Sequence, residues 1–123
     1  MKYEYYNPDY KTMNCIIRSI SKALNVSSEN VYSGLIEINN DYQKERVFEK
    51  YLKNNGFYID DTYNGKLLID TNFDGINIAY TQDNDWYHLV CIINNTIYDK
   101  SSIEDLSCMK IIKVYKLKKK EMK

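Results

Sequence analysis

The 123-residue chain is poor in histidine, proline and cysteine, with one histidine (His88), one proline (Pro8) and three cysteines. The cysteines, at positions 15, 91 and 108, match no metal-binding spacing, and a single histidine leaves no plausible zinc ligand set. An odd number of cysteines fits a reducing compartment better than a disulfide framework. We therefore expect a cytoplasmic protein without a metal or another cofactor.

The chain also lacks long hydrophobic runs and a net charge. No apolar stretch follows a basic N-terminal segment or approaches the length of a membrane span, so we expect neither a signal peptide nor membrane insertion. Residues 110–123 hold seven lysines and one glutamate, a local charge of +6, which leaves −6 on residues 1–109. The acidic body argues against nucleic-acid binding, and the basic tail is more typical of a solvated terminus.

The length and the composition, 44% hydrophobic and 28% charged, predict that residues 1–123 form a single globular domain. Helical spacing of apolar residues comes first and strand patterns follow. Helices are expected at about 14–24, at about 29–38 and between Asp41 and Gly56; strands are expected at 57–61, 76–81, 86–93, 96–99 and 110–117. Residues 1–12 should form an extended or turning arm, 66–70 fit a strand or a helical turn, and 101–106 fit one helical turn. The order predicts an α+β fold with N-terminal helices on a C-terminal antiparallel sheet.

Polar residues mark the expected helix starts, and glycine marks one end. The candidate caps are Thr12 or Asn14, then Ser27 or Ser28, then Asp41, with Gly56 as the stop of the third helix. The helix residues expected to face the core are Ile16, Ile17, Ile20, Ala23, Leu24, Val31, Leu35, Ile38, Val47, Phe48, Tyr51 and Leu52.

Asn94 and Asn95, between two strands, predict a two-residue type I′ turn, because asparagine tolerates positive φ. The resulting register pairs Asp99 with Val90 and places His88 two residues further along the same face. A carboxylate within reach of His88 Nδ1 would fix the tautomer and leave Nε2 facing a site. Alternatively, His88 is an ordinary hydrogen-bonded strand residue and Asp99 simply ends a strand.

Cys15 stands at the expected start of the first helix. There its thiolate would be stabilised by the helix dipole, and a neighbouring imidazolium would lower its pKa further. The alternative is a small buried hydrophobic residue, which is the role we expect for Cys91 and Cys108. Arg18, one turn after Cys15, is expected to pair with an acid or to cover the helix edge rather than to contact a substrate.

The segments that carry these residues are Asn14-Cys15-Ile16-Ile17-Arg18-Ser19-Ile20, Trp86-Tyr87-His88 and Asn94-Asn95-Thr96-Ile97-Tyr98-Asp99. Together they resemble the papain-like cysteine peptidase superfamily, over about residues 14–114. More narrowly, they are similar to small phage and bacterial proteins in which a Cys-x-x-Arg helix precedes a His strand and a Tyr-Asp strand. The resemblance implies a papain-like fold with Cys15 as nucleophile, His88 as general base and acid, and Asp99 as the residue that orients His88.

The chain departs from the papain-like pattern about six residues before the cysteine. Papain-like enzymes usually place there a glutamine that donates to the oxyanion, whereas this chain has Asp9, whose carboxylate would repel negative charge. Asn7 or Asn14 could replace the glutamine, with the backbone N–H of Cys15 as second donor. Asn14 is the weaker candidate, because capping the helix already accounts for it.

Two functions remain open from the sequence. One is a small thiol-dependent hydrolase or acyltransferase, of peptidase, deamidase or amidase type, acting on a peptide or protein substrate with a Cys-His-Asp triad. The other is a catalytically silent, phage-type binding protein on the same scaffold. It would inhibit a host protein, such as a defence enzyme, through a tyrosine-rich surface.

Overall fold

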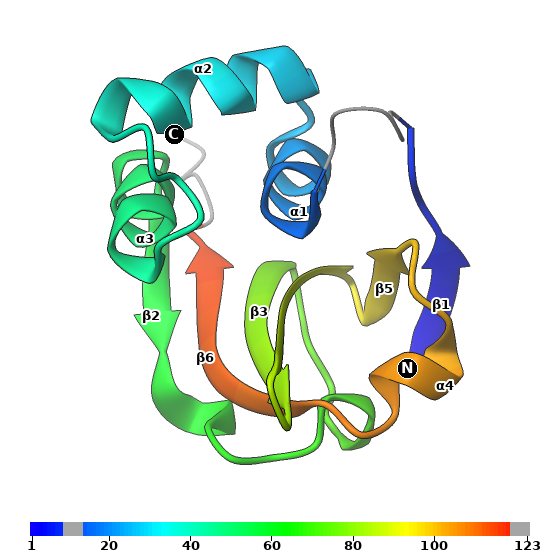
Figure 1. The fold of residues 1–123 in the computed structure, drawn as a ribbon. Coiled ribbons are helices and arrows are strands. Elements are labelled where there is room, and N and C mark those ends of the chain that lie inside the picture. The colour runs from blue at the N-terminus through cyan, green and yellow to red at the C-terminus, as the bar shows by residue number, and fades with distance from the viewer. Residues whose placement is uncertain (9–13, 119–123) are drawn as a thin grey trace, which may run out of the picture.

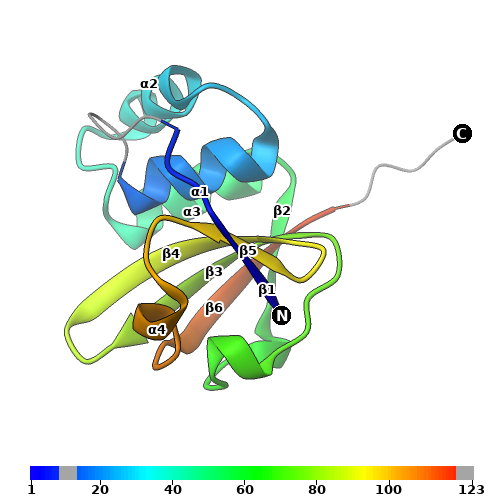
Figure 2. The same cartoon turned by 90° about the vertical axis from the view of Figure 1, so that its right-hand side faces the viewer.

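The computed structural model describes residues 1–8 and 14–118, and it has an α+β architecture. Three helices lie together over one face of a strongly twisted six-stranded sheet (Figures 1 and 2). These three helices are α1 (Cys15–Leu24), α2 (Ser28–Ile38) and α3 (Glu45–Asn54). A fourth helix, α4 (Ile103–Leu106), is a single turn. The strands are β1 (Lys2–Tyr5), β2 (Phe57–Asp60), β3 (Ile76–Asp83), β4 (Trp86–Ile93), β5 (Thr96–Asp99) and β6 (Lys110–Leu117).

Helix α1 begins where the sequence predicts. Asn14 is its N-cap, and its side-chain oxygen accepts hydrogen bonds from the backbone N–H groups of Ile16 and Ile17 at 3.1 and 3.0 Å. At the other end Asn25 adopts a left-handed conformation and closes the helix. The apolar stripe of α1 faces the sheet, so this helix is fixed at both ends and along one side.

The other two helices match their predictions in position, with one error in capping. Ser27 caps α2 by accepting from the N–H of Asn30 at 3.2 Å. Asp41 does not cap α3: the helix begins four residues later, after Lys44, and that residue supplies no side-chain cap. Asp41 instead starts a turn, in which its backbone oxygen accepts from the Lys44 N–H at 3.2 Å. The prediction failed because a polar residue can initiate either a helix or a turn.

The β4–β5 hairpin has the predicted turn and register. Asn94 and Asn95 both have positive φ, 47° and 65°, as a type I′ turn requires. Ile93 pairs with Thr96 on the neighbouring strand. Strand β3 extends two residues beyond its predicted end, to Asp83, and pairs with β4 along its whole length. Short 3₁₀ turns occupy 61–63 and 68–70. Leu67 forms an isolated antiparallel β-bridge with Lys110, so the open segment 66–70 combines one bridge residue with a turn.

The sheet is mixed, so the prediction of an antiparallel sheet is wrong at one edge. The strand order is β1-β5-β4-β3-β6-β2, and β1, from the arm expected to be merely extended or turning, pairs with β5 in parallel. The register places Tyr5 beside Asp99. Sequence patterning missed this strand because β1 is short and largely exposed, with no alternation of buried and exposed residues.

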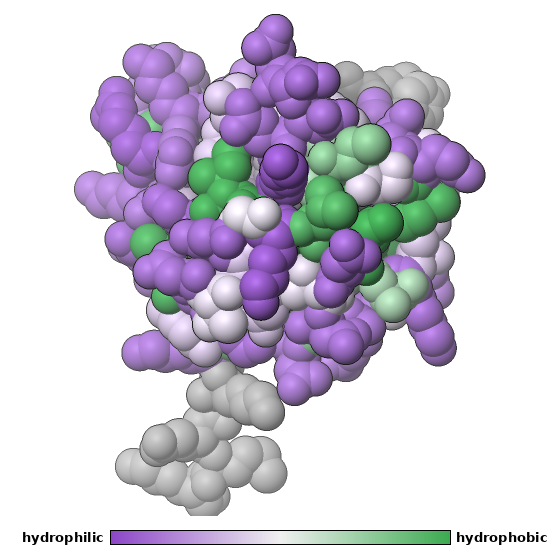
Figure 3. Space-filling model, turned by 90° about the horizontal axis from the view of Figure 1, so that it is seen from below, coloured by the Kyte–Doolittle hydropathy of each residue, from purple (hydrophilic) through white to green (hydrophobic). Residues whose placement is uncertain are grey.

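Each face of the sheet has its own hydrophobic core. The core under the helices joins α1, α2 and α3 to residues such as Ile78, Leu89 and Cys91. The opposite core includes Val90, Ile92 and Ile97 and is closed by the turns around Leu68 and Leu106. Seen from below, the molecule shows hydrophobic patches interrupted by hydrophilic side chains (Figure 3). No helix in the described part of the chain has the length and apolar character needed to cross a membrane.

Candidate active site

The structure brings Cys15, His88 and Asp99 together from α1, β4 and the end of β5. The His88 Nε2 lies 2.8 Å from Asp99 Oδ2, both side chains being almost completely buried. On the other side Cys15 and the His88 ring line the same cavity, and each group shifts the pKa of the other. The thiol, the imidazole and the carboxylate therefore belong to one interacting cluster.

The nitrogen assignment differs from the prediction. Asp99 binds Nε2 and not Nδ1. Because Nε2–H donates to the carboxylate, Nδ1 is the nitrogen left for the Cys15 thiol. The register predicted which residues meet, but it could not fix the ring orientation, which depends on the side-chain torsions of His88 and on what packs beside the ring.

Two contacts hold His88 in place on β4. One is a hydrogen bond to its backbone carbonyl, and the other is the packing of a neighbouring aromatic ring. The His88 carbonyl accepts a hydrogen bond from Thr81 Oγ1 on β3 at 2.7 Å. The Trp86 ring packs against the imidazole, with centroids 4.9 Å apart and planes inclined by 34°. These contacts restrict the ring, so its two nitrogens keep separate roles.

Asp99 has hydrogen-bond partners on both carboxylate oxygens. Oδ2 accepts from His88 and from the Ser101 N–H, which lies 3.2 Å away. Oδ1 faces Arg18, with Nη2 at 3.2 Å and Nε at 3.4 Å. The side chains of Arg18 and Asp99 are 2% and 0% exposed. Arg18 thus pairs with an acid, as expected, and its buried charge adds to the effect of His88 in lowering the pKa of Asp99.

Strand β1 fixes the backbone of Asp99. The N–H of Tyr6, the residue after β1, donates to the Asp99 carbonyl at 2.9 Å. The Tyr3 hydroxyl lies between the Ser101 carbonyl and the Asp99 carbonyl, so its single proton is shared by the two. The parallel strand that the sequence pattern missed therefore holds the residue that orients His88.

The N-terminus of α1 is tied to β4 beside the site. Ser19 Oγ lies 2.6 Å from the Cys15 carbonyl and 2.8 Å from the Leu89 carbonyl, so its single proton bridges the two. This contact joins the helix that carries the thiol to the strand that carries the imidazole, and it fixes their separation.

The electrostatics favour a charged thiol and a charged imidazole. Burial alone would raise the pKa of Cys15, but its hydrogen bond to His88, the charge of His88, a backbone hydrogen bond from Leu89 and the charge of Arg18 lower it below its ordinary value. Burial alone would lower the pKa of His88, but its bonds to Asp99 and Cys15 raise it to about 9. The pKa of Asp99 is lowered against the effect of burial, chiefly by its bond to His88. Both shifts therefore act in the same sense, since they stabilise the thiolate form of Cys15 and the imidazolium form of His88.

A cavity of about 240 Å³ opens onto Cys15 and His88. Its other lining residues are Asn14, Ile16, Gln43, Phe48, Tyr80, Tyr87 and Leu89. Most of this lining is apolar or aromatic, with two side-chain amides, so the cavity can bury a small apolar group next to the thiol and still offer hydrogen bonds.

The sequence raises three positions for the oxyanion site, Asn7, Asp9 and Asn14, and the structure treats each of them differently. Asn14 lines the cavity, but its oxygen caps α1 and its Nδ2 donates to the Tyr42 hydroxyl at 2.7 Å. Asn7 lies after β1 and is not among the described residues that line the cavity. Asp9 lies outside the described residues, as does the alternative cap Thr12. Gln43, which sequence reasoning missed, lines the cavity from the α2–α3 connection. No local pattern marks Gln43, because it approaches Cys15 only through the packing of α2 and α3.

The other cysteines occupy two different environments. Cys91 is buried in the core under the helices, and burial raises its pKa to about 12, as befits an inert hydrophobic residue. Cys108 is exposed, so the expectation that it would be a buried hydrophobic residue is wrong. It precedes β6 outside both cores, next to Ser107, whose Oγ is 3.8 Å from its sulfur.

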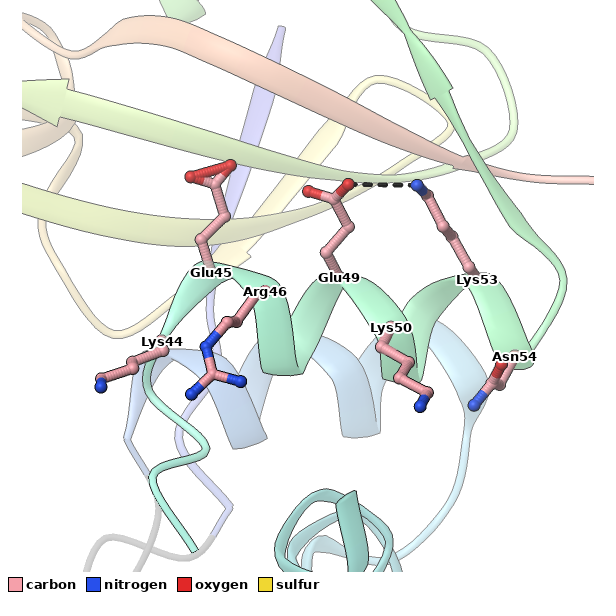
Figure 4. Close-up of a pocket in the computed structure, with 7 residues that line it drawn as sticks. All are labelled: Lys44, Glu45, Arg46, Glu49, Lys50, Lys53 and Asn54. Atoms are coloured by element: carbon pink, nitrogen blue, oxygen red, sulfur yellow. Dashed lines mark ion pairs between the residues drawn. The ribbon is translucent and has the colours of Figure 1, made fainter. Parts of the chain in front are cut away.

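A larger hollow of about 740 Å³ lies along α3, away from the cysteine (Figure 4). Glu45, Glu49 and Lys53 point toward the sheet in this view, and Lys44 and Arg46 point the other way. Glu49 pairs with Lys53 at 3.1 Å. The hollow is lined by charged side chains on an exposed helix and holds no nucleophile, so it is a less suitable reaction site. Among residues 1–8 and 14–118, no group of three His, Cys, Asp or Glu side chains could hold a metal ion.

We compared the chain with protein-family models, with curated proteins and with solved structures, and nothing matched in any of the three. Any assignment of function to this site therefore depends on the residues and their geometry.

Proposed function

We propose that this protein is a small thiol-dependent hydrolase or acyltransferase of the peptidase, deamidase or amidase type. Cys15 is the nucleophile, His88 the general base and acid, and Asp99 the residue that orients His88. The observation that carries the proposal is the interacting cluster that joins the Cys15 thiol, His88, Asp99 and the buried Arg18. A merely structural histidine does not require a cysteine at a helix N-terminus on one side and a doubly anchored carboxylate on the other.

The chemistry follows from the charge state. The Cys15 thiolate attacks the carbonyl carbon of an amide or ester, forms a C–S bond and moves the carbonyl electron pair onto oxygen. When the intermediate collapses, the C–N or C–O bond breaks and His88 Nδ1–H delivers its proton to the leaving group. Water, deprotonated by the now neutral His88, then hydrolyses the thioester. An amine in place of water would give acyl transfer.

The cavity limits the substrate. A volume of about 240 Å³ lined by Phe48, Tyr80 and Tyr87 accommodates a group of roughly one side chain next to the thiol. Tyr87 and its neighbour Trp86 are 52% and 38% exposed, and they can contact the rest of a peptide or protein substrate outside the cavity. We therefore favour one exposed peptide or side-chain amide bond over a long extended peptide.

The resemblance to papain-like cysteine peptidases supports the same assignment. The order Cys, His, Asp along the chain, the helix that begins at the cysteine and the strand that carries the histidine all agree with it. The use of Nδ1 toward the thiol and Nε2 toward the acid is a geometry that can support general acid–base transfer. The three free cysteines fit a reducing compartment such as the cytoplasm.

The first test is the reactivity of the three cysteines. Near pH 7, iodoacetamide should alkylate Cys15 well before the exposed Cys108, with the buried Cys91 last, as followed by peptide mass mapping. Cys15→Ala should lower the rate of p-nitrophenyl acetate hydrolysis by several orders of magnitude while leaving the thermal midpoint nearly unchanged. A Cys15 that reacts no faster than Cys108 contradicts the proposal.

The alternative, a binding protein that inhibits a host factor, predicts a different result. Cys15→Ala would then retain its full biological effect, whereas truncation of exposed aromatic residues such as Tyr87 would remove that effect.

A further inference from the structure

Gln43 carries a side-chain amide that lines the cavity beside Cys15. It lies in the connection between α2 and α3, is exposed, and lines the same cavity as Cys15 and His88. Among the described residues its amide has no hydrogen-bond partner, so its NH₂ group is free to bind a ligand. The other amide that lines the cavity, Asn14, is committed to the helix cap and to Tyr42.

The position of Gln43 is fixed by its neighbour. The Tyr42 hydroxyl accepts a hydrogen bond from Asn14 Nδ2 at 2.7 Å, and Asn14 directly precedes Cys15. Gln43 and Cys15 therefore each follow one member of a hydrogen-bonded pair. The Tyr42 ring also packs edge-on against Tyr32 of α2, with centroids 5.7 Å apart. The connection is thus anchored at the start of α1, which keeps the backbone of Gln43 near Cys15.

The first turn of α1 supplies a second donor. The N–H groups of Ile16 and Ile17 are taken by the Asn14 side chain, whereas among the hydrogen bonds between described residues the Cys15 N–H has no acceptor. An unpaired N–H at a helix start is directed outward and carries part of the positive end of the helix dipole. It is therefore suited to stabilise negative charge that forms beside the Cys15 sulfur.

We propose that Gln43 donates a hydrogen bond to the oxyanion, together with the Cys15 N–H, and so takes the place of the glutamine that the chain lacks before the cysteine. This inference rests on the proposed function. When the Cys15 thiolate adds to a carbonyl, one C–S bond forms and the carbonyl π pair becomes the oxyanion that Gln43 binds. When the pair returns, the bond to the leaving group breaks and the hydrogen bond weakens. Gln43 therefore acts in carbonyl addition, and it has no part in direct alkylation of the thiol.

The experiment compares two reagents on the full chain. The oxyanion forms with p-nitrophenyl acetate but not with iodoacetamide, because iodoacetamide is attacked at its sp³ carbon and releases iodide. We expect Gln43→Ala to slow the acylation of Cys15 by the ester by about 10²-fold or more, as loss of one oxyanion donor does elsewhere. Alkylation by iodoacetamide should stay within about twofold of wild type, because the thiolate–imidazolium pair is untouched.

Two further variants sharpen the test. Gln43→Glu should slow acylation at least as much as Gln43→Ala, because a carboxylate repels the oxyanion. Asn40→Ala, which removes an exposed amide from the same connection, should leave both rates unchanged. Cys15→Ala supplies the background hydrolysis to be subtracted. Tyr80→Phe removes the hydroxyl of another residue that lines the cavity, and it should slow acylation less than Gln43→Ala does.

The outcomes separate the two proposals. Equal ester rates in Gln43→Ala and wild type, or a larger loss in Tyr80→Phe, would overturn the role of Gln43. A parallel fall of both the ester and the iodoacetamide rates would also overturn it, since Gln43 would then act only on the structure. A wild-type Cys15 that is unreactive toward both reagents would instead refute the thiol enzyme itself.

Discussion

Two groups of charged side chains join a helix to a strand among residues 1–8 and 14–118, and one of these two groups ends at a cysteine thiol. The first links α1 to β4 and β5 through Arg18, Asp99, His88 and Cys15. The second links α3 to β6, where Lys113 Nζ lies 3.0 Å from Glu45 and 3.1 Å from Glu49. In the strand order β4 and β6 are separated by one strand, so the two groups occupy different parts of the same sheet.

The last member of the second group is the phenol of Tyr115. The Tyr115 hydroxyl donates to Glu49 at 2.8 Å, and burial together with this carboxylate raises the pKa of Tyr115, so the phenol stays protonated. Lys113 and Glu45 are 25% and 40% exposed, whereas Arg18 and Asp99 are 2% and 0% exposed. The buried group faces a cavity through Cys15, and the half-exposed group holds a helix against a strand. Charge near a pocket is thus a weak guide to chemistry unless it reaches a nucleophile.

The largest expected effect is that of Asp99→Asn. An asparagine cannot balance the buried charge of Arg18, so the free energy of unfolding should fall by about 3–5 kcal/mol. If the variant still folds, its acyl-transfer rate should fall by about 10³- to 10⁴-fold, because His88 loses the acceptor that orients it. Urea titration and ester hydrolysis measure the two effects. If the free energy of unfolding of Asp99→Asn fell by less than about 1 kcal/mol, the buried group would contribute no more to stability than the half-exposed group. That result would contradict the contrast drawn between the two groups.

Next comes the titration of His88. Its pKa is raised to about 9 from an ordinary value near 6.5, so the ring keeps its proton at pH 7 and loses it as the pH rises through about 9. Because the chain has one histidine, its ring protons can be assigned in an NMR titration without mutagenesis. In Cys15→Ala the midpoint should move down, because the thiolate that raises it is absent. A midpoint near 6.5 in the wild-type protein would contradict the thiolate–imidazolium pair.

The smallest expected effect belongs to the second group. Lys113→Met should lower the free energy of unfolding by about 1 kcal/mol or less, because its ion pairs are partly screened by water. The ester rate and the iodoacetamide rate should both remain as in wild type, since neither Glu45 nor Glu49 lines the Cys15 cavity. A change of tenfold in either rate would show that the two groups are coupled through the sheet.

The hairpin shows how far the sequence could predict the site. Two adjacent asparagines define the turn, the turn defines the register, and the register places Asp99 near His88, all within a dozen residues. The start of α1 was equally local, because Asn14 caps its own helix. Asp41, however, shows the limit of such rules, since the same residue type begins a turn instead of a helix.

The sequence by itself determined the α+β order of elements, the hairpin and the identity of the three side chains proposed to react, Cys15, His88 and Asp99. These depend on backbone preferences and periodicity over a few residues. Only the tertiary structure decided that β1 pairs with β5, that Arg18 meets Asp99, that His88 Nε2 faces the acid and that Gln43 lines the cavity. Arg18 and Asp99 are 81 positions apart in sequence, and Asn14 and Tyr42 are 28 apart. Contacts at such separations are set by the packing of helices on a sheet and by the burial of charge, and neither leaves a local pattern in the sequence.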